Sequence, residues 1–368
     1  MTTINETIDF DVERGLLMTR SNVVKGRQTS PKEQIWSRPY TAISIIVGGL
    51  VLLILGCAFS IAKGSKDIPL EEVWQALVAF NPLNSDHQII WELRLPRTIA
   101  GALVGAAFAV SGALMQGMTR NPIADPGLLG VNAGAGFVLA LCFAFFPGLS
   151  FNQLILFSFV GAAVGVGLVY GIGSLAKGGL SPVRLALAGS AVAALLVALS
   201  EGIALYFRIS QDLAFWYAGG VAGVTWAQID ILWPWIVLAL IGSLLLSRSI
   251  TILSLGDDVA SGLGQRTALV RLGAVLAVMV LAGASVSTVG AVGFLGLMIP
   301  HAARAMVGVD YKWVIPTSAI LGALLMVVAD TVGRLSNPPH ETPVSALIAL
   351  IGVPYFFYII RKKVRDNL

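Results

Sequence analysis

Three arginines stand at the ends of apolar segments: Arg94 and Arg97 at the entrance of one, and Arg334 at the end of another. An apolar helix needs no arginine there, and a guanidinium fork is suited to charge-assisted hydrogen bonds with carboxylates. These side chains therefore predict docking of a soluble partner that carries Asp or Glu. Two alternatives are open. The arginines could snorkel to an interface, or Arg334 could pair with Asp330, four residues earlier on the same helix face.

A second polar feature is an acidic pair, Asp257 and Asp258, inside the segment 254–264 between two apolar runs. The segment alternates turn residues with short helical stretches, which predicts two small helices lying along the face of the apolar bundle. Carboxylates at a helix start are stabilised by the positive end of its dipole. The alternative is an ordinary amphipathic loop.

Three further features each have a structural and a functional interpretation. A carboxylate within an apolar segment, such as Glu201, is a functional hypothesis by default, but it could be interfacial or paired with Arg208. Pro182 suits either a rigid constriction or a helix start. An aromatic run could line a ligand path or belong to an interfacial aromatic belt; it comprises Phe215, Trp216 and Tyr217.

No catalytic constellation is found in the sequence. The phosphate-cradling pattern G-x-x-x-x-G-K-[S/T] is absent, so the chain does not bind and split ATP in the P-loop manner. His87, His301 and His340 are scattered over predicted loops without the spacing of metal ligands, and Cys57 and Cys142 lie in apolar runs as small core residues. We therefore expect no metal, no cofactor bound by this chain and no enzyme activity.

The composition defines the class of protein. Of 368 residues, 56% are hydrophobic and 12% are charged, and the mean hydropathy is +0.83. A soluble domain carries about 25% charged residues, so this is the composition of a polytopic membrane protein. The 40 glycines fit this class, because small residues let membrane helices approach closely. The net charge of +4 is no sign of a nucleic-acid partner.

The apolar segments that must position these residues predict an all-α integral membrane protein of about ten transmembrane helices. Each crossing requires about 20 mostly apolar residues, and the eighth segment is the weakest because Pro300 and His301 interrupt it. We expect a partly disordered cytoplasmic tail over 1–40, a membrane domain over 41–361 and a cytoplasmic tail over 362–368. The predicted spans are 41–62, 97–118, 127–146, 152–175, 185–206, 228–247, 268–286, 290–306, 313–333 and 343–360.

Basic residues predict the orientation. No cleavable signal peptide is recognised at the start, so the first span is expected to be an uncleaved anchor with a cytoplasmic N-terminus. Cytoplasmic loops of membrane proteins carry an excess of Lys and Arg, and ten spans place both termini on that side. The inner segments then receive Arg120, Lys177, Arg184, Arg248, Arg266, Arg271, Arg304, Lys312, Arg361, Lys362, Lys363 and Arg365, and the outer loops keep Lys63, Lys66, Arg94, Arg97, Arg208 and Arg334.

From residue 93 onward, the chain resembles the permease family of vitamin B12 and iron–siderophore ABC importers, the type II ABC importers. Motifs of that family recur in family order. They lie at 111–116, 120–122, 127–131, 187–189, 255–258, 293–297, 300–301, 329–331 and 352–354.

The resemblance implies partners and roles. It implies a second permease subunit, identical or homologous, two cytoplasmic ATPase subunits that use ATP and Mg, and an extracytoplasmic siderophore-binding protein, all at the bacterial cytoplasmic membrane. It also implies that the aromatic run belongs to a short extra helix beside the translocation path. The family's ATPase-coupling helices correspond to Leu255, Gly256, Asp257, Asp258, Ala260, Leu263 and Gly264, and its cytoplasmic gate to Ser181, Pro182 and Val183.

Within the family, the runs 125–135 and 180–185 are similar to the ferric-enterobactin type, which implies a ferric catecholate siderophore as the substrate. The rival within the family is a vitamin B12 or haem importer. A rival of another class, an ion-coupled secondary transporter, would need paired intramembrane acids, whereas Glu201 and Asp330 fall on distant spans. One departure is the segment 337–343, which differs from the family pattern and leaves the presentation of Arg334 open.

Overall fold

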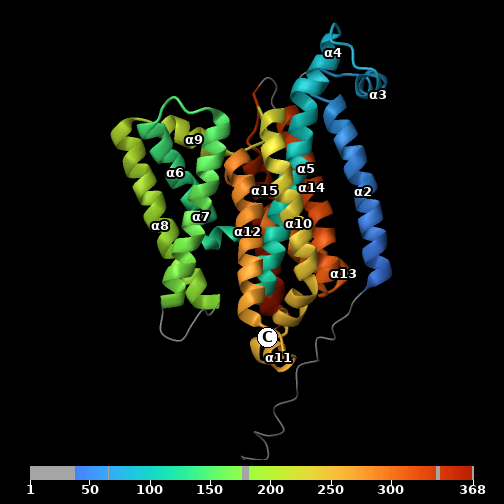
Figure 1. Cartoon of the computed structure of the whole chain (residues 1–368). Coiled ribbons are helices and arrows are strands. Elements are labelled where there is room, and N and C mark those ends of the chain that lie inside the picture. The colour runs from blue at the N-terminus through green and yellow to red at the C-terminus, as the bar shows by residue number, and fades with distance from the viewer. Residues whose placement is uncertain (1–37, 65, 176–181, 337–339, 367–368) are drawn as a thin grey trace, which may run out of the picture. The chain divides into compact units, whose positions relative to one another are not determined.

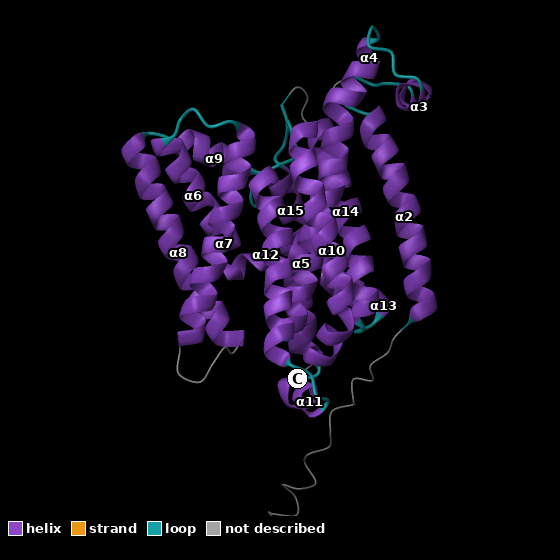
Figure 2. Ribbon diagram, viewed as in Figure 1, coloured by secondary structure: helices purple, strands orange, loops and turns teal. Residues whose placement is uncertain are grey.

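The computed structural model describes residues 38–64, 66–175, 182–336 and 340–366, and the regular elements among them are helices (Figure 2). The predicted N-terminal tail lies almost entirely outside the described residues. At the other boundary, the last helix continues to Asp366, past the predicted limit of the membrane domain at residue 361. The all-helical fold class predicted from the sequence is confirmed.

Ten apolar helices in the described part of the chain correspond to the ten predicted spans. Seven are long and apolar enough to cross a membrane, and α6, α13 and the apolar part of α15 (Val344–Tyr358) are shorter. Their bounds are α2 (Pro39–Ala62), α5 (Leu95–Thr119), α6 (Val131–Phe145), α7 (Phe151–Leu175), α8 (Pro182–Phe207), α10 (Trp226–Ser254), α12 (Thr267–Val289), α13 (Leu295–Val307), α14 (Tyr311–Ser336) and α15 (Val344–Asp366).

Two of the predicted spans begin later than the sequence pattern indicated, because residues with positive φ stop the helix. Gly130 has a φ of 74°, so the short 3₁₀ helix η2 (Pro126–Leu129) precedes α6 instead of joining it. Gly290 and Phe294 have φ of 75° and 64°, so α13 starts only after them. Hydropathy does not register these turns, since the residues in them are apolar.

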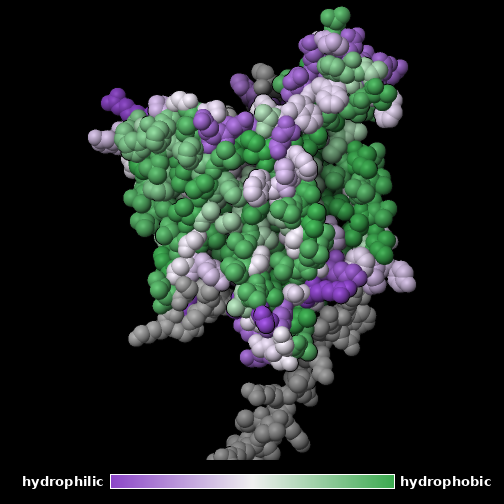
Figure 3. All heavy atoms as spheres, viewed as in Figure 1, coloured by the Kyte–Doolittle hydropathy of each residue, from purple (hydrophilic) through white to green (hydrophobic). Residues whose placement is uncertain are grey.

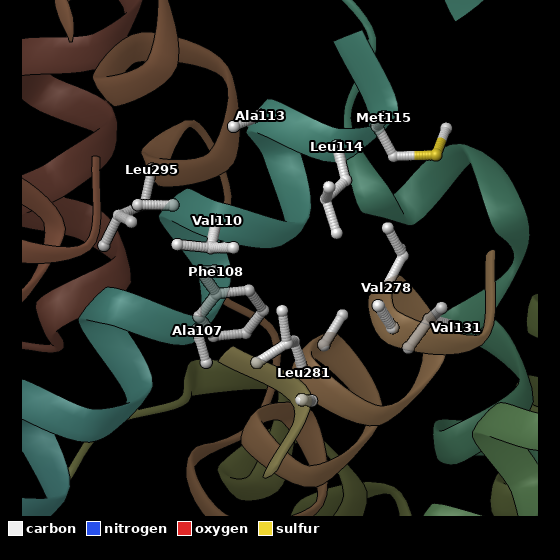
Figure 4. Close-up of a cluster of buried hydrophobic side chains, with 14 of the residues drawn as sticks. Ala107, Phe108, Val110, Ala113, Leu114, Met115, Val131, Val278, Leu281 and Leu295 are labelled. Carbon is white, nitrogen blue, oxygen red and sulfur yellow. The ribbon is translucent and has the colours of Figure 1, made fainter. Parts of the chain in front are cut away.

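Helix α5 forms the centre of the fold and packs against α10, α12, α13 and α14 (Figure 1). Its most apolar window is 83% buried, whereas that of α2, at the periphery, is 11% buried. Side chains of α5 such as Phe108 and Leu114 share a buried cluster with Leu281 of α12 (Figure 4). The charged residues at the two ends of α5 are therefore held on the best-packed helix of the molecule.

Glycines set the distance between the central helices. A Cβ on Gly105 of α5 would lie 2.3 Å from the carbonyl oxygen of Gly322 in α14, and one on Gly112 would lie 1.8 Å from the carbonyl oxygen of Gly296 in α13. Backbones that approach this closely leave no room for a methyl group. The small residues thus perform here the packing role that they have between membrane helices generally.

A proline inside α13 explains a buried polar contact with α5. Pro300 has no N–H, so the carbonyl of Gly296, four residues earlier, lacks its helical donor. The side chain of Gln116 donates to this oxygen at 3.2 Å and also to the oxygen of Leu297 at 3.2 Å. Arg304 in turn donates to the side-chain oxygen of Gln116. Gln116 therefore satisfies a backbone group that a membrane interior would otherwise leave unpaired.

Helices α6, α7 and α8 form a second group beside the central one, and α12 contacts both α6 and α7 (Figure 1). Glycines again set the spacing, because a Cβ on Gly134 of α6 would lie 2.2 Å from the carbonyl oxygen of Gly161 in α7. The short helix α9 (Ser210–Ala218) follows α8 and contacts α6 and α8.

Short helices at opposite ends of the bundle carry the polar features. Helices α3 (Leu70–Val78) and α4 (Ser85–Gln88) and the π-helix η1 (Ile89–Arg94) lie at one end, which we call the α3 end. Helix α11 (Asp257–Gly262) lies at the opposite end, the α11 end (Figure 1). On the face seen in Figure 3, hydrophobic residues predominate between the two ends, and hydrophilic residues gather towards the ends. This distribution is that of a membrane-spanning bundle.

Candidate functional site

Arg94, the first of the predicted docking arginines, is buried with 5% of its surface exposed. It is the last residue of η1, and its guanidinium donates to the carbonyls of Ile61 at 2.6 Å and Ala62 at 2.9 Å, and also to that of Lys66. Two of these carbonyls belong to the last turn of α2, where helical donors are missing. Arg94 therefore ties the end of α2 to the start of α5.

Arg97, in the first turn of α5, binds two carboxylates at once. Its Nη2 and Nε donate to Asp330 of α14 at 2.7 and 3.0 Å, and its Nη1 and Nη2 donate to the two oxygens of Glu341 at 2.7 and 3.0 Å. The side chain is 12% exposed. The predicted affinity of this fork for carboxylates is thus met within the chain itself.

Arg334 forms an ion pair with Asp330, the carboxylate that Arg97 also binds. Its Nε is 3.3 Å from Asp330, whose side chain is 3% exposed, and its Nη2 donates to the hydroxyl of Ser60 in α2 at 2.6 Å. The pairing with Asp330 is the alternative that the spacing of the two residues left open. Asp330 therefore pairs with two arginines, by hydrogen bonds from Arg97 and by an ion pair with Arg334. It joins α14 to α5, while Arg334 joins α14 to α2.

The three arginines line one cavity of about 480 Å³ at the α3 end. Four basic and two acidic side chains line it, so the cavity has an excess of positive charge. They are Lys66, Arg94, Arg97 and Arg334, with Glu92 and Glu341. Such a recess can accept the carboxylate of another molecule, but its most suitable donor, Arg97, is already occupied.

At the α11 end, Asp257 forms a clamp with two arginines from other helices. Arg271 of α12 donates to both oxygens of Asp257 at 2.6 and 2.7 Å, and Arg120, at the end of α5, lies 3.6 Å away. The hydrogen bonds from Arg271 lower the pKa of the Asp257 carboxyl below its ordinary value, so the group is charged at neutral pH. The clamp joins α11 to α12 by these hydrogen bonds and to the end of α5 by the ion pair with Arg120.

The predicted pair of small helices in 254–264 is corrected to one. Residues 257–262 form α11, and the chain then turns at Gly264, whose φ is 78° and which no longer fits a right-handed helix. Gly256, with a φ of 129°, makes the turn before α11. Ala260 is buried, while Asp258 is exposed. Three apolar side chains are 44–67% exposed at this end: Leu255, Val259 and Leu263.

The predicted gate and path are described only in part. Ser181 lies outside the described residues, and Pro182 and Val183 begin α8, with side chains that are likewise outside the description, as is that of Phe215. The gate therefore stays a prediction.

Of the other aromatics, Trp216 lines a second cavity of about 440 Å³. Tyr217 instead packs against α6, where a Cβ on Gly136 would meet its hydroxyl at 2.3 Å. Glu201 is exposed on α8, and no ion pair with Arg208 occurs in the described part of the chain.

Three residues of the candidate site are not assigned a partner by the sequence. Arg120 stands out there only as an inner basic residue and as part of the family motif at 120–122, Arg271 only as an inner basic residue, and Glu341 only as part of a departure from the family pattern. Their partners are 137, 14 and 244 residues away in the chain (Asp257 for both arginines, Arg97 for Glu341), so no local spacing identifies them.

Comparison with known proteins decides what these surfaces belong to. The model of the FecCD transport family matches residues 52–362. The chain belongs to the FecCD transport family. The predicted resemblance to iron–siderophore permeases is thereby confirmed, and the bundle with its two polar ends is that of a membrane-spanning transport subunit.

Individual relatives support the assignment to this family. The chain is 52% identical to the iron(3+)-hydroxamate import system permease protein FhuB of Bacillus subtilis over 93% of this chain and 89% of that one. It is 42% identical to the ferric enterobactin transport system permease protein FepD of Escherichia coli over 88% of this chain and 96% of that one. A solved inward-facing metal-chelate type ABC transporter matches with a TM-score of 0.74 and 28% identity, over 87% of this chain and 99% of that chain.

The chain is therefore a multi-span permease of a bacterial ABC importer for iron chelates, the class to which these relatives belong. A permease of this class works with ATPase and binding-protein partners in the cytoplasmic membrane. The finer assignment to a catecholate substrate stays a prediction, because the hydroxamate permease is more similar to this chain than the enterobactin permease is.

Proposed function

We propose that this chain imports a ferric siderophore as one of two paired permease subunits. The observation that carries the proposal is the match of nearly the whole chain to siderophore permeases, at 52% identity with the hydroxamate type. A ferric hydroxamate is the first candidate substrate, and a ferric catecholate is the second because of the 42% identity with the enterobactin permease. Vitamin B12 or haem is the remaining alternative within the family.

In the proposed assembly, two cytoplasmic ATPase subunits bind ATP and Mg at the α11 end, and a siderophore-binding protein docks at the α3 end. Both termini then lie in the cytoplasm, as the distribution of basic residues predicts. The second permease subunit is identical or homologous. Modification of an engineered Leu83→Cys thiol, at a position 93% exposed on the α3 end, by a membrane-impermeant reagent from the cytoplasmic side would contradict this orientation.

Uptake into proteoliposomes tests the substrate. The permease, purified with its ATPase subunits, is reconstituted and given the binding protein of the same system loaded with radioactive iron. We expect ATP-dependent accumulation of a ferric hydroxamate such as ferrichrome in excess of ferric enterobactin, haem or vitamin B12. Preferential accumulation of haem or vitamin B12 would overturn the siderophore assignment, and accumulation driven by an ion gradient without ATP would overturn the transport class.

The coupling role of α11 depends on its attachment to the membrane helices. The exposed Leu255, Val259 and Leu263 offer an apolar surface to an ATPase subunit, while Asp257 holds the segment to α12 and α5 through Arg271 and Arg120. A displacement of α11 by an ATPase subunit would then move α12 and the central helix α5 with it. The predicted coupling residues thus divide into a contact surface and an anchor.

Reversing the anchor charge should uncouple hydrolysis from transport. Asp257→Arg places three positive charges together, so α11 should detach from α5 and α12, and uptake should fall while ATP hydrolysis by the complex persists. The matched control is the double variant Asp257→Arg with Arg271→Asp, which restores an opposite-charge pair and should recover part of the uptake. Equal uptake by the wild type and the single variant would show that the clamp transmits nothing.

The cavity at the α3 end is the proposed docking site. Its excess of basic side chains suits acidic residues on the binding protein, and charge complementarity of this kind gives specificity and fast association. The iron chelate would then pass towards the cavity lined by Trp216.

A further inference from the structure

The fork of Arg97 already holds a carboxylate in the geometry that a docking partner would need. Glu341 accepts from Nη1 at 2.7 Å and from Nη2 at 3.0 Å, one hydrogen bond on each of its oxygens. This is the bidentate arrangement that favours arginine for carboxylate recognition. The site therefore does not present a free guanidinium in this conformation.

The two carboxylates on Arg97 differ in how easily they can leave. Asp330 is 3% exposed and also pairs with Arg334, so it is fixed within the bundle. Glu341 is 43% exposed and lies just before the start of α15, in a segment held by a hydrogen bond from Thr342 to the carbonyl of Gly333. Because 43% of the Glu341 side chain already meets solvent, its release requires less free energy than release of the buried Asp330. Glu341 is thus the exchangeable ligand, and Asp330 is the permanent one.

The position of the pair adds a second observation. Arg97, Glu341 and Ala222 line both the cavity of about 480 Å³ with the three arginines and the cavity of about 440 Å³ with Trp216. The Arg97–Glu341 contact therefore stands at the boundary between the candidate docking site and the candidate path. A change at this contact affects both cavities at once.

We propose that Glu341 is an internal stand-in for a carboxylate of the binding protein, and that docking proceeds by exchange of one carboxylate for the other on Arg97. The inference rests on the proposed docking function and adds to it a competitor within the permease. Exchange keeps a second carboxylate on Arg97 throughout, which matters because Asp330 is shared with Arg334 and cannot neutralise both arginines in a site of low exposure. The released Glu341 moves away from the boundary of the two cavities, so docking itself opens the path.

The exchange makes a prediction of unusual sign: removing an acidic residue from the permease should tighten its complex. In the wild type, Glu341 must leave Arg97 before the binding protein can bind there. The apparent affinity of docking is therefore lower than it would be if Arg97 were free. In Glu341→Gln this competitor is neutral and holds Arg97 more weakly. We expect the binding protein to dock about three- to tenfold more tightly, a change of the size of one partly exposed ion pair.

The control is a second acid in the same cavity. Glu92 lines the cavity and is exposed, and among the described residues no ion pair joins it to the three arginines. Glu92→Gln removes the same charge without freeing a guanidinium, so it measures the general electrostatic effect alone. We expect it to change docking by less than about twofold at physiological salt, where charges are screened over about 8 Å.

The measurement uses the full permease with its ATPase subunits in lipid nanodiscs, and the siderophore-binding protein of the same system as the probe, followed by biolayer interferometry. Thermal stability of each variant checks folding, and Glu341→Ala repeats the test without the amide. Equal tightening by Glu341→Gln and Glu92→Gln, or weaker docking of Glu341→Gln, would overturn the exchange while leaving docking at this site intact. A wild-type complex that never binds its binding protein would overturn the proposed function, and the exchange with it.

Discussion

Replacement of Asp330 by alanine is expected to abolish import and to lower the stability of the folded permease. Asp330 accepts from Arg97 and lies 3.3 Å from the Nε of Arg334, and its side chain is 3% exposed. Removing one partner of a buried ion pair leaves an uncompensated charge and costs about 3–5 kcal/mol. Here the removal affects two arginines together. The ends of α2, α5 and α14 at the α3 end should therefore separate.

The midpoint of thermal unfolding of the purified complex measures this loss, and proteoliposome uptake measures the function. Asp67→Ala is the matched control, because Asp67 forms an ion pair with Lys63 at the same end of the bundle but is 63% exposed. An exposed pair contributes about 0.2–1 kcal/mol at most, so this variant should unfold and import almost as the wild type does. Equal stabilities of the two variants would show that the Asp330 network does not hold the helices together.

Substitution of Gly112 by alanine is expected to have the second large effect, through packing alone. The added Cβ would lie 1.8 Å from the carbonyl oxygen of Gly296, which is backbone and cannot rotate away. Alanine favours a helix over glycine by about 1 kcal/mol, but forcing a packed core apart costs about 1–3 kcal/mol or more. The steric effect should win, with the gap between α5 and α13 widening and the Gln116 hydrogen bond to Gly296 breaking.

Gly101→Ala on the same helix isolates the steric cause. Its Cβ would meet its nearest neighbours, in Met326 and Val327, at 3.9 Å, an ordinary van der Waals distance. We expect this variant to be as stable as the wild type or slightly more so, because only the gain in helix propensity remains. Yield of folded complex and its unfolding temperature distinguish the two glycines. A Gly112→Ala protein as stable as Gly101→Ala would contradict the close packing of α5 on α13.

The sequence predicted the candidate site by residue type but not by partner. The arginines at the ends of α5 and α14 were found because their charge contradicts the apolar pattern around them. The pair of Arg334 with Asp330 was also within reach, since their spacing of four residues places them on one helix face. The hydrogen bonds of Arg97 to two carboxylates could not be predicted in this way, because Asp330 and Glu341 lie 233 and 244 residues away in the chain. Sequence spacing carries no information about contacts between helices so far apart.

The sequence by itself determined the class of fold, because length and hydropathy of a membrane span are properties of adjacent residues. It also placed the polar segment that contains α11, since a run of turn residues and acids between apolar segments is equally local. The tertiary structure alone decided where α6 and α13 begin and which backbone carbonyls accept a hydrogen bond from Gln116. It also decided that Arg94 ties α2 to α5, and that Arg97 is held by carboxylates of its own chain. The physical reason is that these depend on how closely distant helices approach, which glycines such as Gly112 permit but do not specify.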